Sequence, residues 1–365
     1  MKHVVMILTN GYHPDVRVKK EAEYLESLGY RITILCWDRD NRFKDRATED
    51  QGKIQIVRFF PYAQYGSGAC KQFKSYLQFL KECREYLIEI NFDFLHCHDL
   101  DGAIIGYLCG KRDIPVIFDM HEYYVNAHNF LKKWMQAALV QYCQRRASWI
   151  IYLNQRQKRD IIKKNRNKLV FLPNYSKKIR NQNKVFCETI RIAYIGEVRC
   201  KTEMENLISA AAKVGGIQVN IHGGGVCYQE LAEKYEAWPD VYFTGRFLPE
   251  QVEELYANTD YIYAIYDKIQ NHTTGYPVKF YEGLNSVTPV IAGKGTSMGA
   301  FVEENSVGFT VDGSSGKDVE ALLQKLRGCR DLVENCRRNI REQGLDRQFL
   351  WDDIVKNLDK IYGGV

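Results

Sequence analysis

The chain has 365 residues, of which 45% are hydrophobic and 26% are charged. This length favours two domains, and the composition is typical of a soluble globular protein, not of a fibrous or disordered one. The N-terminal apolar run VVMIL is too short for a signal-peptide core or a membrane-spanning helix, so we expect a cytoplasmic protein.

The 11 cysteines are scattered and contain no Cys-x-x-Cys pair. A disulfide framework or a zinc site would need closer spacing, so we expect buried thiols.

Basic residues are concentrated in the first half of the chain. Up to Lys184 there are 32 Lys and Arg against 19 Asp and Glu, a balance of +13, whereas the remainder has 19 against 26, a balance of −7. A basic half favours an anionic partner, such as membrane phospholipid, a pyrophosphate or nucleic acid. An ordinary solvated surface explains the same charge equally well.

The first half alternates apolar runs with segments of helical period. Helices are expected from Asp15 to Gly29, over DGAIIGYLCGKR and over LKKWMQAALVQYCQRRA. Strands are expected at HVVMILT, RITILCW, DFLHCH, PVIFDM, WIIYLN and KLVFLPN. This alternation forces parallel pairing, with helices on both faces of the sheet.

The polar segment SKKIRNQNK is expected to be a linker, after which the alternation begins again. Strands are expected at IRIAYIGEV, IQVNIHGGG, VYFTGR, YIYAIY, TPVIA and VGFTV, with helices between them. We therefore expect two Rossmann-like, doubly wound α/β domains, residues 1–178 and 188–345, facing a cleft. Residues 346–365 are expected to form a helix that packs back toward the first domain. Ligands in such sheets lie at the carboxyl ends of the strands.

Candidate site residues in the first half follow three of these strands. Gly11, after the first, would let the backbone approach a phosphate, but without a Gly-x-Gly-x-x-Gly pattern a dinucleotide site is not supported. His96 and His98 would share a strand face, and two histidines without a third ligand nearby are a weak metal signal. His121 and Glu122 follow PVIFDM, where a histidine could contact a substrate hydroxyl or transfer a proton. Structural roles remain open for each.

Candidates in the second half are cations at the starts of helices. Arg199 and Lys201 follow the strand IRIAYIG, where they suit a diphosphate. Pro277 suits the first turn of a helix that carries Lys279 and Glu282 three residues apart on one face. A cation for phosphate and a carboxylate for ribose hydroxyls would together hold a sugar nucleotide. Surface ion pairs are the alternative.

The order of these segments resembles the retaining glycosyltransferases of family 4, which have the GT-B fold. The resemblance covers nearly the whole chain, from HPDVRVKKEAEYLESLGYRITIL through LHCHDL, FDMHEYY and LVFLPN to IAYIGEVRCK, VNIHGGG, VYFTGRF and PVKFYEGLNSVTPVIA. It implies a transferase that moves a sugar from a nucleoside diphosphate sugar to an acceptor hydroxyl, with no obligatory metal or other cofactor and no nucleic-acid partner.

The resemblance also implies roles for single residues. Glu282 matches the second glutamate of the family's Glu-x7-Glu motif, which binds the ribose, and Lys279 matches the lysine of a Pro-x-Lys-x-x-Glu subgroup. Arg199 and Lys201 match basic residues on the diphosphate, and His121 matches a histidine that contacts the donor sugar.

Two departures from the family pattern concern the donor. Thr274 stands where the first motif glutamate, which holds the sugar's hydroxyls, is expected. Glu197 stands where an arginine often follows the strand, which leaves Arg199 as the stronger phosphate ligand.

The acceptor is expected to dock on the first domain, with Asp99 and Glu122 as its contacts. Trp134 and Tyr142, among cations in FLKKWMQAALVQYCQRR, fit peripheral binding to an anionic membrane that carries a lipid-linked sugar, and so surface-glycan assembly. That helix could equally be core. The alternative functions are a silent sugar-nucleotide-binding partner, which Thr274 favours, and a GT-B sugar-nucleotide epimerase.

Overall fold

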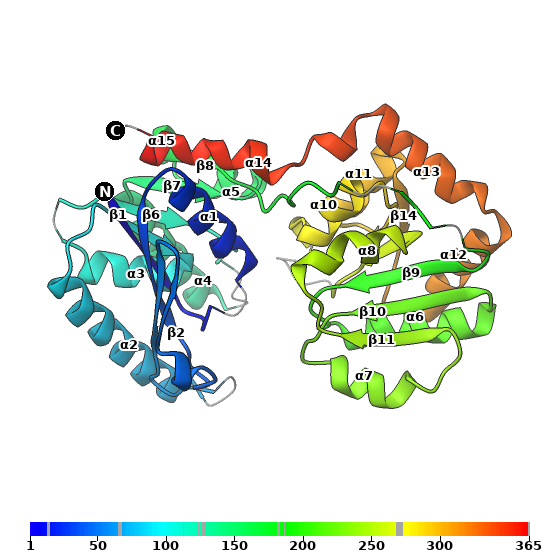
Figure 1. Ribbon diagram of the computed structural model, residues 1–365, viewed down its shortest axis with the longest axis horizontal. Helices are drawn as coiled ribbons and strands as arrows, with labels where there is room; N and C mark the ends of the chain where they lie inside the picture. Colours follow the sequence, from blue (N-terminus) through cyan, green and yellow to red (C-terminus); the bar gives the residue numbers. More distant parts are fainter. Residues whose placement is uncertain are drawn as a thin grey trace. The chain divides into compact units, whose positions relative to one another are not determined.

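The structure is a computed structural model that describes residues 1–12, 15–64, 68–111, 113–122, 124–125, 129–180, 183–185, 187–267 and 273–363. The chain divides into two compact units. The first comprises Met1–Pro173 and Val355–Val365, and the second comprises Asn174–Ile354. Both chain termini therefore belong to the first unit (Figure 1).

The first unit is built on an eight-stranded sheet of order β3-β4-β2-β1-β5-β6-β7-β8. All neighbouring strands pair in parallel except β3, which runs antiparallel to β4. The strands are β1 (His3–Leu8), β2 (Arg31–Trp37), β3 (Thr48–Gln51), β4 (Ile54–Phe59), β5 (Phe94–His98), β6 (Val116–Asp119), β7 (Trp149–Tyr152) and β8 (Leu169–Phe171).

Helices cover both faces of this sheet, because its strands are apolar on both sides. They are α1 (Val16–Ser27), η1 (Lys44–Arg46), α2 (Ala69–Glu89), α3 (Asp99–Cys109), α4 (Phe130–Arg146), α5 (Gln155–Asp160), η2 (Lys163–Lys168), η5 (Val355–Leu358) and α15 (Asp359–Tyr362). One core cluster joins alternate strand residues, such as Val5 and Ile7, to α2, α3 and α4. The alternate set, with Val4 and Met6, is buried on the other face.

The second unit contains a six-stranded parallel sheet of order β11-β10-β9-β12-β13-β14. Its strands are β9 (Ile190–Ile195), β10 (Ile217–His222), β11 (Val241–Gly245), β12 (Tyr261–Ala264), β13 (Val290–Gly293) and β14 (Gly308–Val311). Its helices are α6 (Lys201–Val214), α7 (Tyr228–Tyr235), η3 (Pro249–Gln251), α8 (Val252–Ala257), α10 (Val278–Asn285), α11 (Ser297–Asn305), α12 (Gly316–Gly328), α13 (Asp331–Glu342), η4 (Leu345–Arg347) and α14 (Trp351–Ile354). Two core clusters, one on each face of the sheet, hold these layers together.

The expectation of two doubly wound parallel α/β sheets is confirmed. The elements that were not anticipated include β3, β4 and the 21-residue helix α2 in the first unit, and α12 and α13 after the last strand of the second. The segment expected to be a linker belongs to the second unit, where Ser176 and Ile179 are buried and the Lys184 amine donates to the Tyr256 carbonyl.

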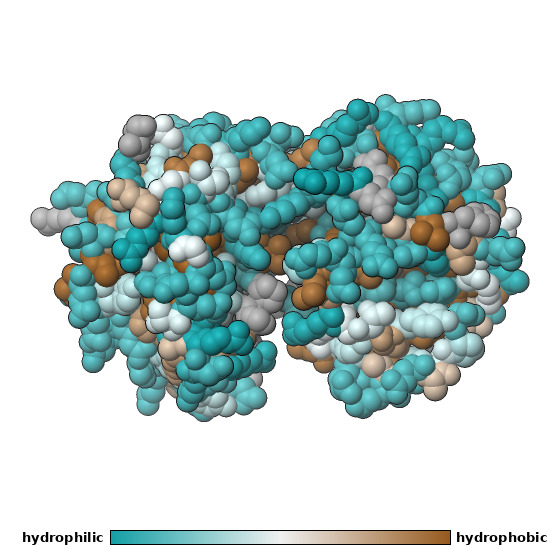
Figure 2. All heavy atoms as spheres, viewed as in Figure 1, coloured by the Kyte–Doolittle hydropathy of each residue, from teal (hydrophilic) through white to brown (hydrophobic). Residues whose placement is uncertain are grey.

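The surface seen in Figure 2 is mostly hydrophilic, with hydrophobic residues in separate small patches. Among the helices in the described part of the chain, none combines the length and the apolar character needed to cross a bilayer.

Candidate functional site

In the first unit, β1, β5 and β6 are adjacent, and the candidate residues follow their carboxyl ends. The chain passes from β1 to β2 on one side of β1 and later returns, from β4, to β5 on the other side. This reversal makes the carboxyl edge a switch point, where ligands bind in doubly wound sheets. His98 ends β5, Asp119 ends β6 and His121 follows two residues later. The pairing of β5 with β6 thus brings His98 close to Asp119 and His121, although these lie more than 20 positions further along the sequence.

Arg17 of α1 is the central cation of this group, and sequence analysis missed it. Its guanidinium donates to both Asp119 oxygens, at 3.0 and 3.1 Å, and to the Leu172 carbonyl at 3.0 Å. Its Nε lies 3.0 Å from Oε1 of Glu21, one helical turn along α1. Although burial opposes ionisation, Arg17 and then His121 hold the pKa of Asp119 well below its ordinary range.

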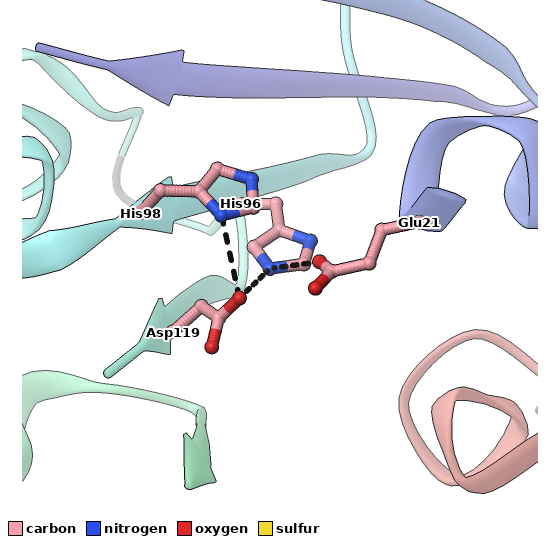
Figure 3. Close-up of side chains that lie close together, drawn as sticks. All are labelled: Glu21, His96, His98 and Asp119. Atoms are coloured by element: carbon pink, nitrogen blue, oxygen red, sulfur yellow. Dashed lines mark ion pairs between the residues drawn. The ribbon is translucent and has the colours of Figure 1, made fainter. Parts of the chain in front are cut away.

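Glu21, His96, His98 and Asp119 form a fully buried cluster (Figure 3). The two imidazole rings stack with centroids 4.4 Å apart, as expected for residues on one strand face. His96 Nε2 lies 3.6 Å from Glu21 Oε2 and 3.7 Å from Asp119 Oδ2. Burial lowers the pKa of both histidines, that of His98 to about 3, and burial together with Asp119 raises the pKa of Glu21 to about 8.

The expectation that no further metal ligand lies near His96 and His98 is wrong, because Glu21 and Asp119 complete a donor set of four. This set suits a divalent cation in ligand type. Arg17, however, already contacts both carboxylates and supplies the positive charge that they require. We therefore interpret the cluster as a charge-balanced support for the neighbouring His121.

His121 lies at the edge of this cluster with 16% of its side chain exposed. Its Nε2 is 3.0 Å from Asp119 Oδ2, and its Nδ1 is 3.6 Å from Asp99 Oδ2. Burial alone would lower the pKa of His121, but the carboxylates of Asp99 and Asp119 outweigh it and raise the pKa to about 9. At neutral pH His121 is therefore an imidazolium, which can donate a hydrogen bond to an oxygen-rich ligand.

Asp99 is the first residue of α3, and Glu122 directly follows His121 in the chain. Asp99 adopts a left-handed backbone conformation, φ +62°, and its carboxylate accepts a 2.7 Å hydrogen bond from Tyr124. Glu122 is exposed, and its backbone carbonyl accepts from Gln157. Both side chains remain candidates for acceptor contact.

Gly11 also belongs to the first unit. The helix that follows it is capped by Asp15, whose carboxylate accepts from the Val18 amide, so that amide is already paired. Residues 13 and 14 of this loop lie outside the described part of the chain. A phosphate at this helix start would meet a carboxylate, which weakens the predicted role of Gly11.

In the second unit, the loops after β9 and β10 pack closely together. Gly223 has φ +134° and Gly225 has φ +138°. A Cβ atom on Gly223 would lie 2.0 Å from the Gly196 carbonyl oxygen, and a Cβ atom on Gly225 would lie 2.5 Å from the Val198 carbonyl oxygen. Only glycine fits these positions. The two loops are also joined by hydrogen bonds, since the Gly196 amide donates to the His222 carbonyl and the Val198 amide to the Gly224 carbonyl. They lie beside the switch between β9 and β12.

Lys279, in the first turn of α10, is only 6% exposed. Its amine lies 3.2 Å from the ring centroid of Tyr194 and 5.3 Å from that of Tyr266. The amine has no hydrogen-bond partner within the described residues, and it lies close to Gly196. Burial lowers its pKa to about 7, although Glu282 opposes this effect. A buried amine without an acceptor is a natural place for an anion.

Glu282 lies one turn after Lys279, half-buried, and its Oε2 accepts a 3.0 Å hydrogen bond from the hydroxyl of the fully buried Tyr256. This bond fixes the orientation of the carboxylate. Thr274 is half-buried in a helical turn before α10. The structure thus brings Lys279 and Glu282 together on one helix, as predicted from their spacing.

Arg199 and Lys201 are more exposed than Lys279. Arg199 pairs with Glu197, and Lys201 pairs with Glu230. Arg246 was missed by sequence analysis, and its guanidinium lies against Gly224 in the glycine loop. Tyr194, Tyr256 and Tyr266 were also missed. For Tyr194 and Tyr266 the signal was a tyrosine in, or two residues after, the strands IRIAYI and YIYA; Tyr256 lies in α8 and had no such signal.

Comparisons with known proteins agree on one class. The model described as "Glycosyl transferase 4-like domain" matches residues 14–175, and "Glycosyl transferases group 1" matches residues 175–343. A search of curated protein sequences finds no relative.

Similar solved structures cover the whole chain at low identity. Sucrose-phosphate synthase from Thermosynechococcus elongatus is 14% identical with a TM-score of 0.77, over 100% of this chain and 98% of that one. Anabaena HepE in complex with UDP and glucose is 13% identical with a TM-score of 0.70, over 100% of both. WaaG, described as a glycosyltransferase involved in lipopolysaccharide biosynthesis, is 13% identical with a TM-score of 0.67, over 99% and 100%. With both halves matched and the fold shared, the chain belongs to the family-4-like glycosyltransferases of the GT-B fold.

Proposed function

We propose that this glycosyltransferase uses a nucleoside diphosphate sugar and retains the configuration of the transferred carbon. The observation that carries the proposal is Lys279. Its buried amine has no acceptor within the described residues and lies beside the glycine-lined backbone after β9, where a diphosphate would provide one. The UDP bound to HepE supports a uridine nucleotide as the first donor to test.

The donor is proposed to bind through contacts of complementary chemistry. Lys279, Arg199, Lys201 and the positive end of the α10 helix dipole would stabilise the negative charge that develops on the departing diphosphate. Glu282, held by Tyr256, would accept hydrogen bonds from the ribose hydroxyls. No metal is needed for this charge balance, so we propose transfer without a metal cofactor.

His121 is proposed to contact the transferred sugar. As an imidazolium paired with Asp119 it can donate to a sugar hydroxyl, and it would offset negative charge near the reacting carbon. Arg17 and the buried cluster would hold it in place. Asp99 and Glu122 would then be within reach of the acceptor.

The acceptor is proposed to be a hydroxyl of a glycan or a lipid-linked sugar in surface polysaccharide assembly on the cytoplasmic side of the membrane. The similarity to WaaG supports this class of acceptor. Helix α4 contains Lys and Arg but no Asp or Glu, and this supports a peripheral position at an anionic membrane.

A catalytically silent sugar-nucleotide-binding subunit is the second candidate, because Thr274 replaces the first motif glutamate. The purified protein should first be screened for thermal stabilisation by nucleoside diphosphate sugars, since binding raises the melting temperature by mass action. The donor that stabilises it is then incubated with lipid-linked acceptors. Release of nucleoside diphosphate with an α-linked product from an α-linked donor supports the transferase. Binding without release, with every acceptor, favours the silent subunit.

A further inference from the structure

The solvent-facing side of α4 is more apolar than is usual for a surface helix. Phe130 is 84% exposed and Trp134 is 62% exposed, and four more large apolar side chains are exposed beside them: Leu131, Met135, Leu139 and Tyr142. Only Val140, Cys143 and Gln144 of this helix are buried, against the rest of the first unit. The expectation that α4 could be a core helix is therefore wrong.

The exposed apolar residues form one surface. Phe130, Trp134, Ala138 and Tyr142 follow each other at intervals of four, as do Leu131, Met135 and Leu139, so the two rows lie side by side on the helix. Surface helices normally place charged residues on this face. An exposed apolar surface of this kind marks a contact with another body.

The charges that α4 itself carries are all of one sign. Lys132, Lys133, Arg145 and Arg146 are exposed, and no Asp or Glu occurs between residues 123 and 159 of the sequence. A symmetric dimer through this face would bring four positive charges against four others, which opposes self-association. A partner with an apolar interior and a negatively charged surface matches both properties.

We propose that the outer face of α4 binds an anionic phospholipid bilayer, with the helix lying along the interface. Its apolar residues enter the region of the headgroups and upper acyl chains, Trp134 and Tyr142 lie at the interface that these side chains favour, and the four cations contact lipid phosphates. The proposal deepens the proposed function by naming the surface that brings the enzyme to a lipid-linked acceptor. Its test needs no turnover, so it can fail independently of transferase activity.

The test measures binding of the full chain to vesicles of phosphatidylcholine, with or without 30% phosphatidylglycerol, by flotation. The wild type should float with the anionic vesicles. Leu131→Glu with Met135→Glu should weaken binding by about a hundredfold, because two apolar anchors become charged. Lys132→Gln with Lys133→Gln should weaken it by about 25-fold, about fivefold for each charge.

The matched control is a pair of glutamate substitutions at exposed apolar residues outside α4. Tyr242 and Leu248 of the second unit are also exposed apolar residues, and Tyr242→Glu with Leu248→Glu should float as the wild type does. All these sites are exposed, so the melting temperatures should change little.

The fluorescence of Trp134 gives a second measurement, which reports whether this face of α4 contacts the lipid. Vesicles with lipids brominated near the headgroup should quench part of the tryptophan fluorescence of the wild type. They should quench much less in Trp134→Phe, although this variant still floats. Lack of flotation, flotation that survives the paired glutamate changes in α4, or dimerisation through α4 in solution would each overturn the proposal.

Discussion

We predict that the affinity for the nucleotide falls as the pH rises above 7, because of the buried amine of Lys279. Burial lowers the pKa of its amine to about 7, whereas an exposed lysine has a pKa of about 10.4. A diphosphate beside this amine would favour its charged form and raise its pKa again. Binding must then take up a proton above pH 7, and affinity must fall as the pH rises.

The size of the effect follows from linkage. If the pKa of Lys279 is about 7 in the free protein and about 10 in the complex, affinity at pH 9 is about 50-fold lower than at pH 7. At pH 8, binding takes up about 0.9 proton, because the free amine is mostly neutral and the bound amine mostly charged. The nucleotide's own phosphate titrates near pH 6, below this window.

Isothermal titration calorimetry at pH 8, in two buffers of different ionisation enthalpy, measures this proton uptake directly. The Lys279→Met variant is the control, since it has a similar shape and no charge, and it should bind with no uptake assigned to this position. If the wild type and Lys279→Met take up the same number of protons, or if affinity is flat between pH 7 and pH 9, Lys279 does not contact the diphosphate.

Four further predictions test the remaining roles. Glu282→Ala should weaken nucleoside diphosphate binding by roughly 2 kcal/mol, because ribose hydroxyls lose a charged acceptor, and unchanged affinity in a folded variant refutes its role. Arg199→Ala should lower turnover by about ten- to a thousandfold, and wild-type turnover would mean that the diphosphate is held by other groups such as Arg246. His121→Ala should lower turnover by about a hundredfold or more and leave nucleotide affinity nearly unchanged; a lower melting temperature with normal turnover would make it a structural histidine. Arg17→Ala should destabilise the first unit by about 3 kcal/mol at pH 7, because the buried Asp119 carboxylate loses its guanidinium partner and keeps the His121 imidazolium. Since the pKa of Asp119 is depressed in the folded state, this difference should be present above about pH 4 and shrink as the pH falls below it, which urea unfolding across that range would measure.

The strand order was accessible from sequence because apolar runs alternate with helical periods, and parallel pairing then leaves few topologies. Helix α2 was harder to recognise, since its 21 residues include only three buried positions, Phe79, Cys83 and Leu87. The pair Lys279 and Glu282 could be predicted because both lie on one helix. Arg17 could not, because its partner Asp119 is 102 residues away and only the fold brings them together. The exposure of α4 was also hidden, since an apolar helix face has the same period whether it meets core or solvent.

The last residues of the chain complete the first unit. The Tyr362 hydroxyl lies 2.9 Å from His96 Nδ1, and its ring contacts Tyr30 and Phe94 edge-on. Asn357 donates to the Phe171 carbonyl. During synthesis, therefore, the N-terminal sheet emerges from the ribosome long before the segment that covers one of its faces. Residues 174–354 leave the ribosome in between, so the second unit can fold before the first is complete. Until the segment with Tyr362 is made, the histidine cluster of the first unit is open to water on that side.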